Sequence, residues 1–313
     1  METINKITTS KQTTMYDHLC KMIIGNEEVL SRIIKAAVDE ANHLNVEEIR
    51  RLIKGVHIGD LIVNPHFHLV DKKGFIKDEG MVYYDILCYI DVPQEDGKNI
   101  RVYLNVEIQN NPYPGYSIIT RGYAYVSRIV SEQWGSEYDD KNYDGMKKVY
   151  SLWIMPKAPK RKDGHMNVYE TNGRIICGTT VEEKEIYDKG VILAIYLNKE
   201  HDLNKKYEEH DELLTPLMVL LNNVLDYKGK QRIIEEYGLN TKKIESEVKD
   251  MCDLGESIAL EARNEGKQIE RKEKNIAHVK KLMIGLQMSF KEAINLLEIP
   301  EKEVKEIEKY FQS

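Results

Sequence analysis

Two stretches in the first half of the chain alternate apolar and polar residues in the manner of β-strands. They are MVYYDILCYID at 81–91 and NIRVYLNVEIQ at 99–109. The segment between them, QEDGKN, contains Asp96-Gly97, which is a strong turn signal when it lies between strand-like runs. The pattern therefore predicts an antiparallel hairpin.

The rest of the first 200 residues shows helical and strand-like segments in a mixed order. Apolar residues recur at helical spacing in some segments, and short apolar runs bounded by Gly, Pro or Asp occur in others. The predicted elements are one or two helices within 15–43, a short helix at 46–53, a strand-like run at 61–71, a helix at 116–134, and strands at 148–155 and 190–198. Helices, three strands, a helix and further strands predict an α/β protein with a mixed sheet.

From residue 207 onward the pattern becomes helical and rich in charge. Near the end, Ser289 and Glu292 have the spacing of a capping box, and Pro300 suits the first turn of a following helix. We therefore predict a first domain at 1–205 and a helical C-terminal region at 206–313 that ends in a helix-turn-helix-like pair. The charged helices are either solvated faces or surfaces for self-association into a homo-oligomer.

The last predicted helix, EKEVKEIEKYF, has few of the side chains that read DNA bases. It balances Lys with Glu and has no Arg, Asn or Gln before Gln312. Because those three residue types make most contacts with base edges, the pattern favours a packing module over a sequence-specific DNA reader.

The predicted hairpin carries three polar residues of chemical interest: Asp85, Glu107 and Gln109. Residues two apart on a strand point to the same face, so Glu107 and Gln109 project together. A two-residue loop would set Asp85 opposite Ile108. A three- or five-residue loop, with Gly97 forming a bulge, would bring Asp85 beside Glu107.

Two adjacent carboxylates can form an oxygen-ligand site for a hard divalent cation. Mg²⁺ takes few protein ligands and keeps several waters, and a bound metal polarises a phosphate and activates water. The simpler interpretation is that Asp85 and Glu107 are solvated residues on the outer face of a half-buried hairpin. The spacing alone leaves both interpretations open.

Four segments together resemble the PD-(D/E)XK nuclease superfamily, and more closely its bacterial Rpn-like branch of recombination-promoting nucleases and putative transposases. They are Asp85, the tripeptide at 107–109, the run YSIITRGYAYVSRIVSEQW at 116–134, and YSLWIMPKAP at 150–159. The resemblance implies a restriction-endonuclease-like mixed sheet flanked by helices. It also implies a metal-dependent DNA endonuclease that hydrolyses phosphodiester bonds in mobile-element recombination or in defence.

The resemblance also assigns roles to individual residues. It implies that Asp85 and Glu107 are catalytic and hold Mg²⁺ or Mn²⁺, and that Gln109 orients water or a phosphate oxygen. The substrate-binding residues that it implies are Arg121, Tyr125 and Gln133.

Some positions depart from the family pattern. Tyr84 stands where Pro is usual, and Gln109 stands where the parent motif has a charged Lys. Asp17 and Lys21 resemble a short D-x-x-x-K feature that opens the domain in relatives. The departures fit an alternative function, in which the protein is a catalytically inactive nuclease-fold module that binds DNA or protein.

Charge and composition narrow these expectations further. The net charge of −7 argues against a uniformly basic nucleic-acid binder, but Lys and Arg gather at 147–148, 157–162 and 271–281, where local phosphate contacts are possible. The four Cys are scattered, which indicates neither a zinc site nor a disulfide framework and suggests a reducing, cytoplasmic setting. We expect no membrane partner, because the sequence has no apolar run of about 18 residues.

Tyrosine is unusually abundant relative to phenylalanine. The chain has 19 Tyr and 4 Phe, and Tyr113, Tyr116, Tyr123 and Tyr125 cluster just after the Glu107 motif. Such rings either stack on unpaired bases or pack in the core with their hydroxyl groups at its rim. We favour the core for Tyr123, and for Tyr125 both interpretations remain open.

Overall fold

The computed structural model describes residues 2–59, 84–202, 204–239 and 241–312, and the chain forms two compact units. The first unit covers 1–252 and the second covers 253–313. The division falls within the long helix α8 (Lys242–Gly285). The first unit contains the sheet and all of the predicted site residues.

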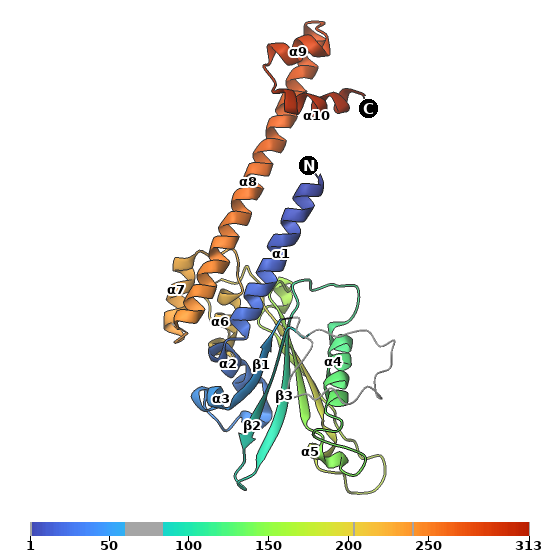
Figure 1. Cartoon of the computed structure of the whole chain (residues 1–313), viewed down its shortest axis with the longest axis vertical. Helices are drawn as coiled ribbons and strands as arrows, with labels where there is room; N and C mark the ends of the chain where they lie inside the picture. Colours follow the sequence, from blue (N-terminus) through green and yellow to red (C-terminus); the bar gives the residue numbers. More distant parts are fainter. Residues whose placement is uncertain (1, 60–83, 203, 240, 313) are drawn as a thin grey trace. The chain divides into compact units, whose positions relative to one another are not determined.

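The first unit is an α/β fold built on a six-stranded mixed sheet (Figure 1). The strand order is β1-β2-β3-β4-β6-β5. Neighbouring strands are antiparallel from β1 to β3 and between β6 and β5, and they are parallel from β3 through β4 to β6. The strands are β1 (Ile53–Ile58), β2 (Ile86–Pro93), β3 (Asn99–Ile108), β4 (Lys148–Met155), β5 (Met166–Tyr169) and β6 (Gly190–Tyr196). The predicted mixed sheet is confirmed.

The hairpin of β2 and β3 has a loop longer than two residues. Ile86 pairs with Val106, and the ladder continues to the end of both strands. The Gln94 N–H then donates to the Lys98 carbonyl at 2.8 Å, which leaves three residues in the turn. The last of these, Gly97, has a φ of 80°, a left-handed conformation that glycine adopts without strain. Of the two loop lengths that the sequence leaves open, the longer one, with Gly97 in the turn, is observed.

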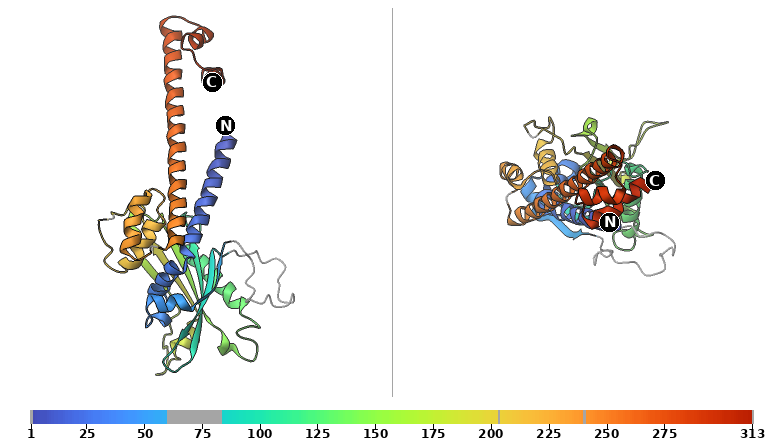
Figure 2. Two further views of the ribbon diagram at one scale, coloured as in Figure 1. Left: turned by 60° about the vertical axis from the view of Figure 1, so that its left-hand side comes forward. Right: turned by 90° about the horizontal axis from the view of Figure 1, so that it is seen from above.

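One face of the sheet is covered by α4 (Ile118–Glu132), which connects β3 to β4 (Figures 1 and 2). The helix starts at Ser117, whose side chain accepts a hydrogen bond from the Thr120 N–H. Gly122 lets α4 approach the sheet closely, because a Cβ there would lie 2.9 Å from Ile192 and 3.0 Å from Trp153. The approach places the amino-terminal part of α4 near the end of β3.

The opposite face is covered by helices from both ends of the first unit. These are α1 (Glu2–Ile24), α2 (Glu27–Ala37), α3 (Val46–Leu52) and α6 (Asp211–Leu220), with α7 (Tyr227–Glu236) packed against α6. Asn26 caps α2 by accepting a hydrogen bond from the Glu28 N–H, which explains why the predicted helical stretch divides into two helices. The buried side chains that these helices contribute are mostly apolar, and Ser31 of α2 and Thr215 of α6 are buried polar exceptions.

Some elements differ from the prediction. The predicted boundary at 205/206 precedes the observed division, because α6 packs on α2 and joins the first unit. Three elements were not predicted from the sequence: β1, which begins where the short helix α3 ends, β5, and the short helix α5 (Lys184–Tyr187). The strand-like run at 61–71 lies outside the described residues.

The second unit is a small helical assembly. The carboxyl-terminal part of α8, α9 (Phe290–Leu296) and α10 (Glu301–Gln312) share an apolar core that includes Val279, Ala293 and Ile307. Ser289 and Glu292 form the predicted capping box at the start of α9. The structure thus supports a packed helix pair at this end of the chain.

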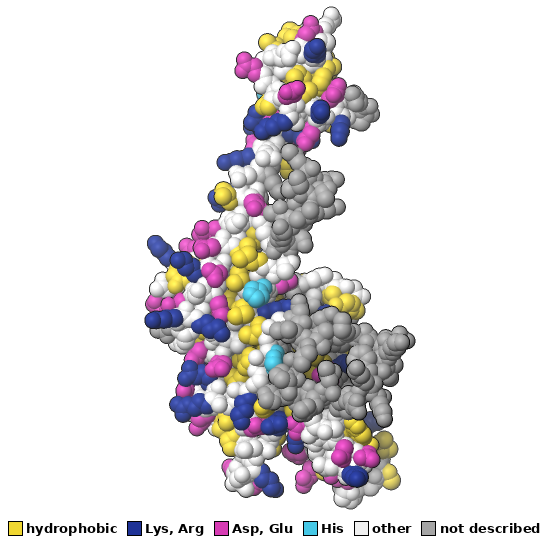
Figure 3. Space-filling view, viewed as in Figure 1, with side chains coloured by type: hydrophobic (Ala, Val, Ile, Leu, Met, Phe, Trp, Pro, Cys, Tyr) yellow, Lys and Arg dark blue, Asp and Glu magenta, His cyan; other side chains and the backbone are white. Residues whose placement is uncertain are grey.

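The surface carries mixed charge. Lys and Arg side chains are interspersed with Asp and Glu side chains on the face shown in Figure 3. Within the described residues, no helix combines the length and the apolar character that crossing a bilayer requires.

Candidate functional site

Asp85 and Glu107 meet at the end of the sheet where β2 begins and β3 ends. The Asp85 N–H donates to Glu107 Oε1 at 3.0 Å, and the Ile108 N–H donates to Asp85 Oδ2 at 2.9 Å. Each carboxylate is therefore held by the backbone of the neighbouring strand. The predicted convergence of the two acids is observed.

Glu107 is buried rather than solvated. Only 4 % of the residue is exposed, and a chain of buried polar side chains leads to it. The Trp153 indole N–H donates to Ser151 Oγ at 2.9 Å, the Ser151 hydroxyl donates to Asn105 Oδ1 at 3.0 Å, and Asn105 Nδ2 donates to Glu107 Oε1 at 2.8 Å. The interpretation of Glu107 as a solvated residue on an outer face is wrong.

The environment of Glu107 disfavours its negative charge. Burial raises the pKa of Glu107 well above its usual range, and the nearby charge of Asp85 raises it further. The hydrogen bonds from Asn105 and from the Asp85 backbone lower the pKa, as does the positive charge of Arg121, but these effects are smaller than that of burial. A bound cation would replace the proton by stabilising both carboxylates.

Helix α1 adds a cation and a third acid at this end of the sheet. The Lys21 Nζ lies 2.9 Å from Asp85 Oδ1. One turn earlier, Asp17 accepts a hydrogen bond from Asn110 Nδ2 at 2.6 Å. Burial raises the pKa of Asp17, and the charge of Asp85 contributes to the rise, which places the two acids within electrostatic reach. In the sequence, this Asp and Lys match only the short D-x-x-x-K feature.

Arg121 faces the site from the first turns of α4. Its Nη1 donates to the Tyr116 hydroxyl at 2.9 Å, and its Nη2 donates to the Tyr125 hydroxyl at 2.6 Å. Tyr125 is only 6 % exposed, and its ring packs edge-on against Tyr84 and Trp153. Tyr125 is therefore placed to position the guanidinium rather than to stack on a base.

Gln109 continues the sheet beyond the end of β3. Its backbone N–H donates to the Ile154 carbonyl at 2.8 Å. Its side-chain Nε2 donates to the Asn111 carbonyl at 2.6 Å and so braces the loop that follows. The structure thus gives Gln109 a structural contact that the sequence analysis did not anticipate.

Gln133 lies at the other end of α4, away from the other candidates. It is fully buried, its Nε2 donates to the Lys147 carbonyl at 3.2 Å, and its Oε1 accepts from the Lys147 N–H at 2.8 Å. Lys147 precedes the amino-terminal end of β4, whereas the two carboxylates lie at the carboxyl end of the parallel strand β3. This position does not fit the substrate-binding role predicted for Gln133.

The donor set suits a hard divalent cation that keeps most of its waters. Both hydrogen bonds described for Glu107 end on Oε1, so Oε2 can take a metal without loss of either bond. Across the described ranges, no cluster of three or more His, Cys, Asp and Glu side chains is arranged to hold a metal. Mg²⁺ needs only one or two carboxylates, and the pair formed by Asp85 and Glu107 fits that requirement.

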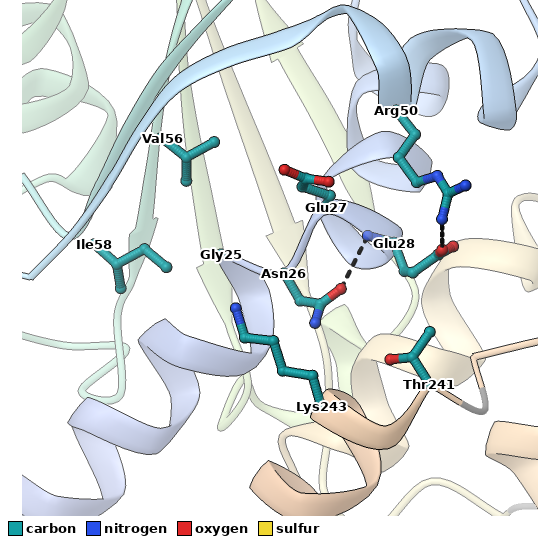
Figure 4. A pocket seen from close by; sticks show the side chains of 9 residues that line it. All are labelled: Gly25, Asn26, Glu27, Glu28, Arg50, Val56, Ile58, Thr241 and Lys243. Atoms are coloured by element: carbon teal, nitrogen blue, oxygen red, sulfur yellow. Dashed lines mark hydrogen bonds and ion pairs between the residues drawn. The ribbon is translucent and has the colours of Figure 1, made fainter.

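A separate cavity of about 470 Å³ lies at the amino-terminal end of α2 (Figure 4). Its lining mixes charges, with Glu28 paired to Arg50 and with Lys243 nearby. None of the predicted site residues lines it. The candidate chemistry therefore rests on the carboxylate pair rather than on this cavity.

Three supporting residues were missed by the sequence analysis: Asn105, Ser151 and Trp153. A signal was present, since Asn105 and Ser151 are polar residues that stand between apolar neighbours inside strands. Asn105 also lies two residues before Glu107 and so shares its face. A buried polar residue on the face of a candidate acid is a sign of a built site.

Known proteins give no assignment for this site, because no family model, curated protein or solved structure matches the chain.

Proposed function

We propose that the protein is a metal-dependent DNA endonuclease with a restriction-endonuclease-like fold. The observation that carries the proposal is the pairing of the partly buried Asp85 with the buried Glu107, which are interlocked through backbone hydrogen bonds at the end of the hairpin. The order of helices, three strands, α4 and a parallel strand agrees with the fold that the resemblance implies. Mobile-element recombination or defence would be its setting.

Asp85 and Glu107 would hold Mg²⁺ or Mn²⁺. The bound metal would polarise the scissile phosphate and lower the pKa of an attacking water. Arg121, fixed by two tyrosine hydroxyl groups, would contact the backbone phosphate. A guanidinium held in this way loses little conformational freedom when it binds a phosphate.

Lys21 would supply the positive charge that Gln109 cannot. In the parent motif a Lys occupies the position of Gln109, and a neutral amide cannot replace its charge. The Lys21 ammonium reaches the same site from α1 and lies 2.9 Å from Asp85 Oδ1. The departure at Gln109 is therefore compatible with catalysis.

The second candidate function is a catalytically inactive module that keeps the nuclease fold and binds DNA or protein. Two contacts favour it: Lys21 already neutralises Asp85, and the Gln109 amide is bonded to the Asn111 carbonyl. In that case the ion pair would replace the metal rather than assist it.

Nicking of supercoiled plasmid with Mg²⁺ or Mn²⁺ separates the two functions. We expect metal-dependent nicking by the wild type and its loss in Asp85→Asn and in Glu107→Gln, both of which keep the side-chain shape. The loss should exceed the roughly 10- to 100-fold effect that removal of a residue supporting a metal ligand produces.

The matched control is Glu95→Gln, which removes a carboxylate from the exposed turn of the same hairpin. It should nick as the wild type does, and EDTA should stop all activity. Wild-type protein that nicks neither single-stranded nor double-stranded DNA, although correctly folded, would exclude the enzyme in favour of the binding module.

A further inference from the structure

Two tyrosine rings project into solvent from the loop at 110–117, which joins β3 to α4. Tyr113 is 67 % exposed and Tyr116 is 53 % exposed. The loop begins three residues after Glu107, at the end of the sheet where the carboxylates lie. Large exposed rings next to a candidate active site indicate a surface that binds a partner.

Hydrogen bonds hold this loop in one conformation. Gln109 donates to the Asn111 carbonyl, and the Asn111 side chain accepts from the Tyr113 N–H at 3.0 Å. Asn110 ties the loop to α1 through Asp17. The sequence NPYPG also contains two prolines, which restrict the backbone before binding. The backbone that carries the rings therefore has little conformational entropy left to lose on binding.

The rings lie among groups that suit a phosphate backbone. The Tyr116 hydroxyl accepts a hydrogen bond from Arg121, whose guanidinium carbon lies 5.9 Å from the centre of the Tyr116 ring. Basic residues also follow β4 at the same end of the sheet, in the turn at Lys160–Lys162. Aromatic faces beside cations form the combination that binds single-stranded nucleic acids.

We propose that Tyr113 and Tyr116 stack on unpaired bases, so that the strand bound at the carboxylate pair is single-stranded DNA. The inference rests on the proposed function for the identity of the bound polymer. Gln109, Asn110 and Asn111 are then positioning residues that hold the rings at the site.

Single-stranded DNA fits these rings better than a duplex does. In a duplex the bases stack on one another, and proteins reach mainly their edges and the phosphates. In a single strand the faces of the bases are open, and each base has a face that can stack on an aromatic ring regardless of sequence.

The test is fluorescence anisotropy with labelled oligo-dT and with a duplex of the same length, in EDTA so that binding is measured without cleavage. We expect tighter binding of the single strand. Tyr113→Ala and Tyr116→Ala should each weaken it by roughly 5- to 150-fold, the range that loss of one stacked base produces. Tyr113→Phe should bind as the wild type does, because the ring remains.

Tyr143→Ala is the matched control. Tyr143 is 60 % exposed but precedes β4, at the opposite end of the strands, so its loss should leave binding unchanged. Equal affinity for single strand and duplex, wild-type affinity in both alanine variants, or no binding of oligo-dT would each overturn the inference.

The outcomes separate this inference from the proposed function. Metal-dependent nicking without tyrosine-dependent binding of single strands would overturn the inference alone. Tyrosine-dependent binding without nicking would retain the stacking surface and overturn the endonuclease.

Discussion

The two faces of the central sheet are built from the same strands but have different chemistry. On the face covered by α1, α2, α3 and α6, the buried residues of β3 and β4 are apolar, and they include Leu104, Val106 and Leu152. On the face covered by α4, Asn105, Glu107 and Ser151 are buried next to them. Because successive side chains of a strand point to opposite faces, β3 and β4 each present apolar residues on one face and these polar residues on the other.

The apolar face shows what stability alone requires, and the polar chain on the other face is not needed for that purpose. A buried carboxyl disfavours folding unless its environment compensates for lost hydration, and a buried hydrogen-bonded network gains little over an apolar core. Each member of the chain from Trp153 to Glu107 is bonded to the next. We infer that the α4 face gives up stability to hold one carboxyl in place.

The largest expected effect on stability comes from the apolar face. Leu152→Ala should lower the free energy of unfolding by about 2–5 kcal/mol, because it leaves a cavity in the core. The nicking rate per folded molecule should change little. Ser151→Ala, one residue away on the other face, should do the reverse, with a smaller loss of stability and a larger loss of activity. Urea unfolding and nicking assays measure both, and equal effects of the two variants would remove the distinction between the faces.

The second effect is a dependence of stability on pH. The pKa of Glu107 is raised in the folded protein from the ordinary value of 4.5, so its contribution to stability is complete below about pH 4.5 and is lost as the pH rises through the folded pKa. As the pH rises from about 5 to about 9, the free energy of unfolding of the metal-free wild type should therefore fall relative to that of Glu107→Gln by more than about 1.4 kcal/mol, the equivalent of one pKa unit. A constant difference between the two proteins from about pH 5 to about pH 9 would contradict the buried position of Glu107.

The smallest effect concerns the support of the ligand. Asn105→Leu keeps approximately the same volume but removes the amide that donates to Glu107 Oε1. Stability should change little, whereas Mn²⁺ affinity should fall by roughly 10- to 100-fold, as expected for loss of a residue that orients a metal ligand. Asn99→Leu, at the exposed end of the same strand, is the control. Unchanged Mn²⁺ affinity in Asn105→Leu would mean that the polar chain does not serve the site.

Local signals in the sequence were sufficient for the hairpin. The Gly97 turn and the alternation in the flanking strands predicted the hairpin but left the length of its loop open. The longer loop, which brings Asp85 beside Glu107, was one of the alternatives, and it is the one observed. The helix after the motif was also predicted, since its apolar spacing and the breaker-rich NNPYPG before it are local features.

Long-range packing decided what the sequence could not show. Lys21 reaches Asp85 only because α1 packs against β3, and the two residues are 64 positions apart (85 − 21). Gln133 caps the helix that carries Arg121, but α4 is long enough to place Gln133 at the opposite end of the strands. The packing of α6 on α2, which joins α6 to the first compact unit, is another contact between segments far apart in the sequence.

The most direct test of the carboxylate pair is calorimetric titration of Mn²⁺ into the wild type, Asp85→Asn, Glu107→Gln and the control Glu95→Gln. We predict that the wild type and Glu95→Gln bind the metal and that both site variants lose this binding while remaining folded. Undiminished binding in both site variants would show that the cation is held elsewhere and would contradict the assignment of Asp85 and Glu107 as its ligands.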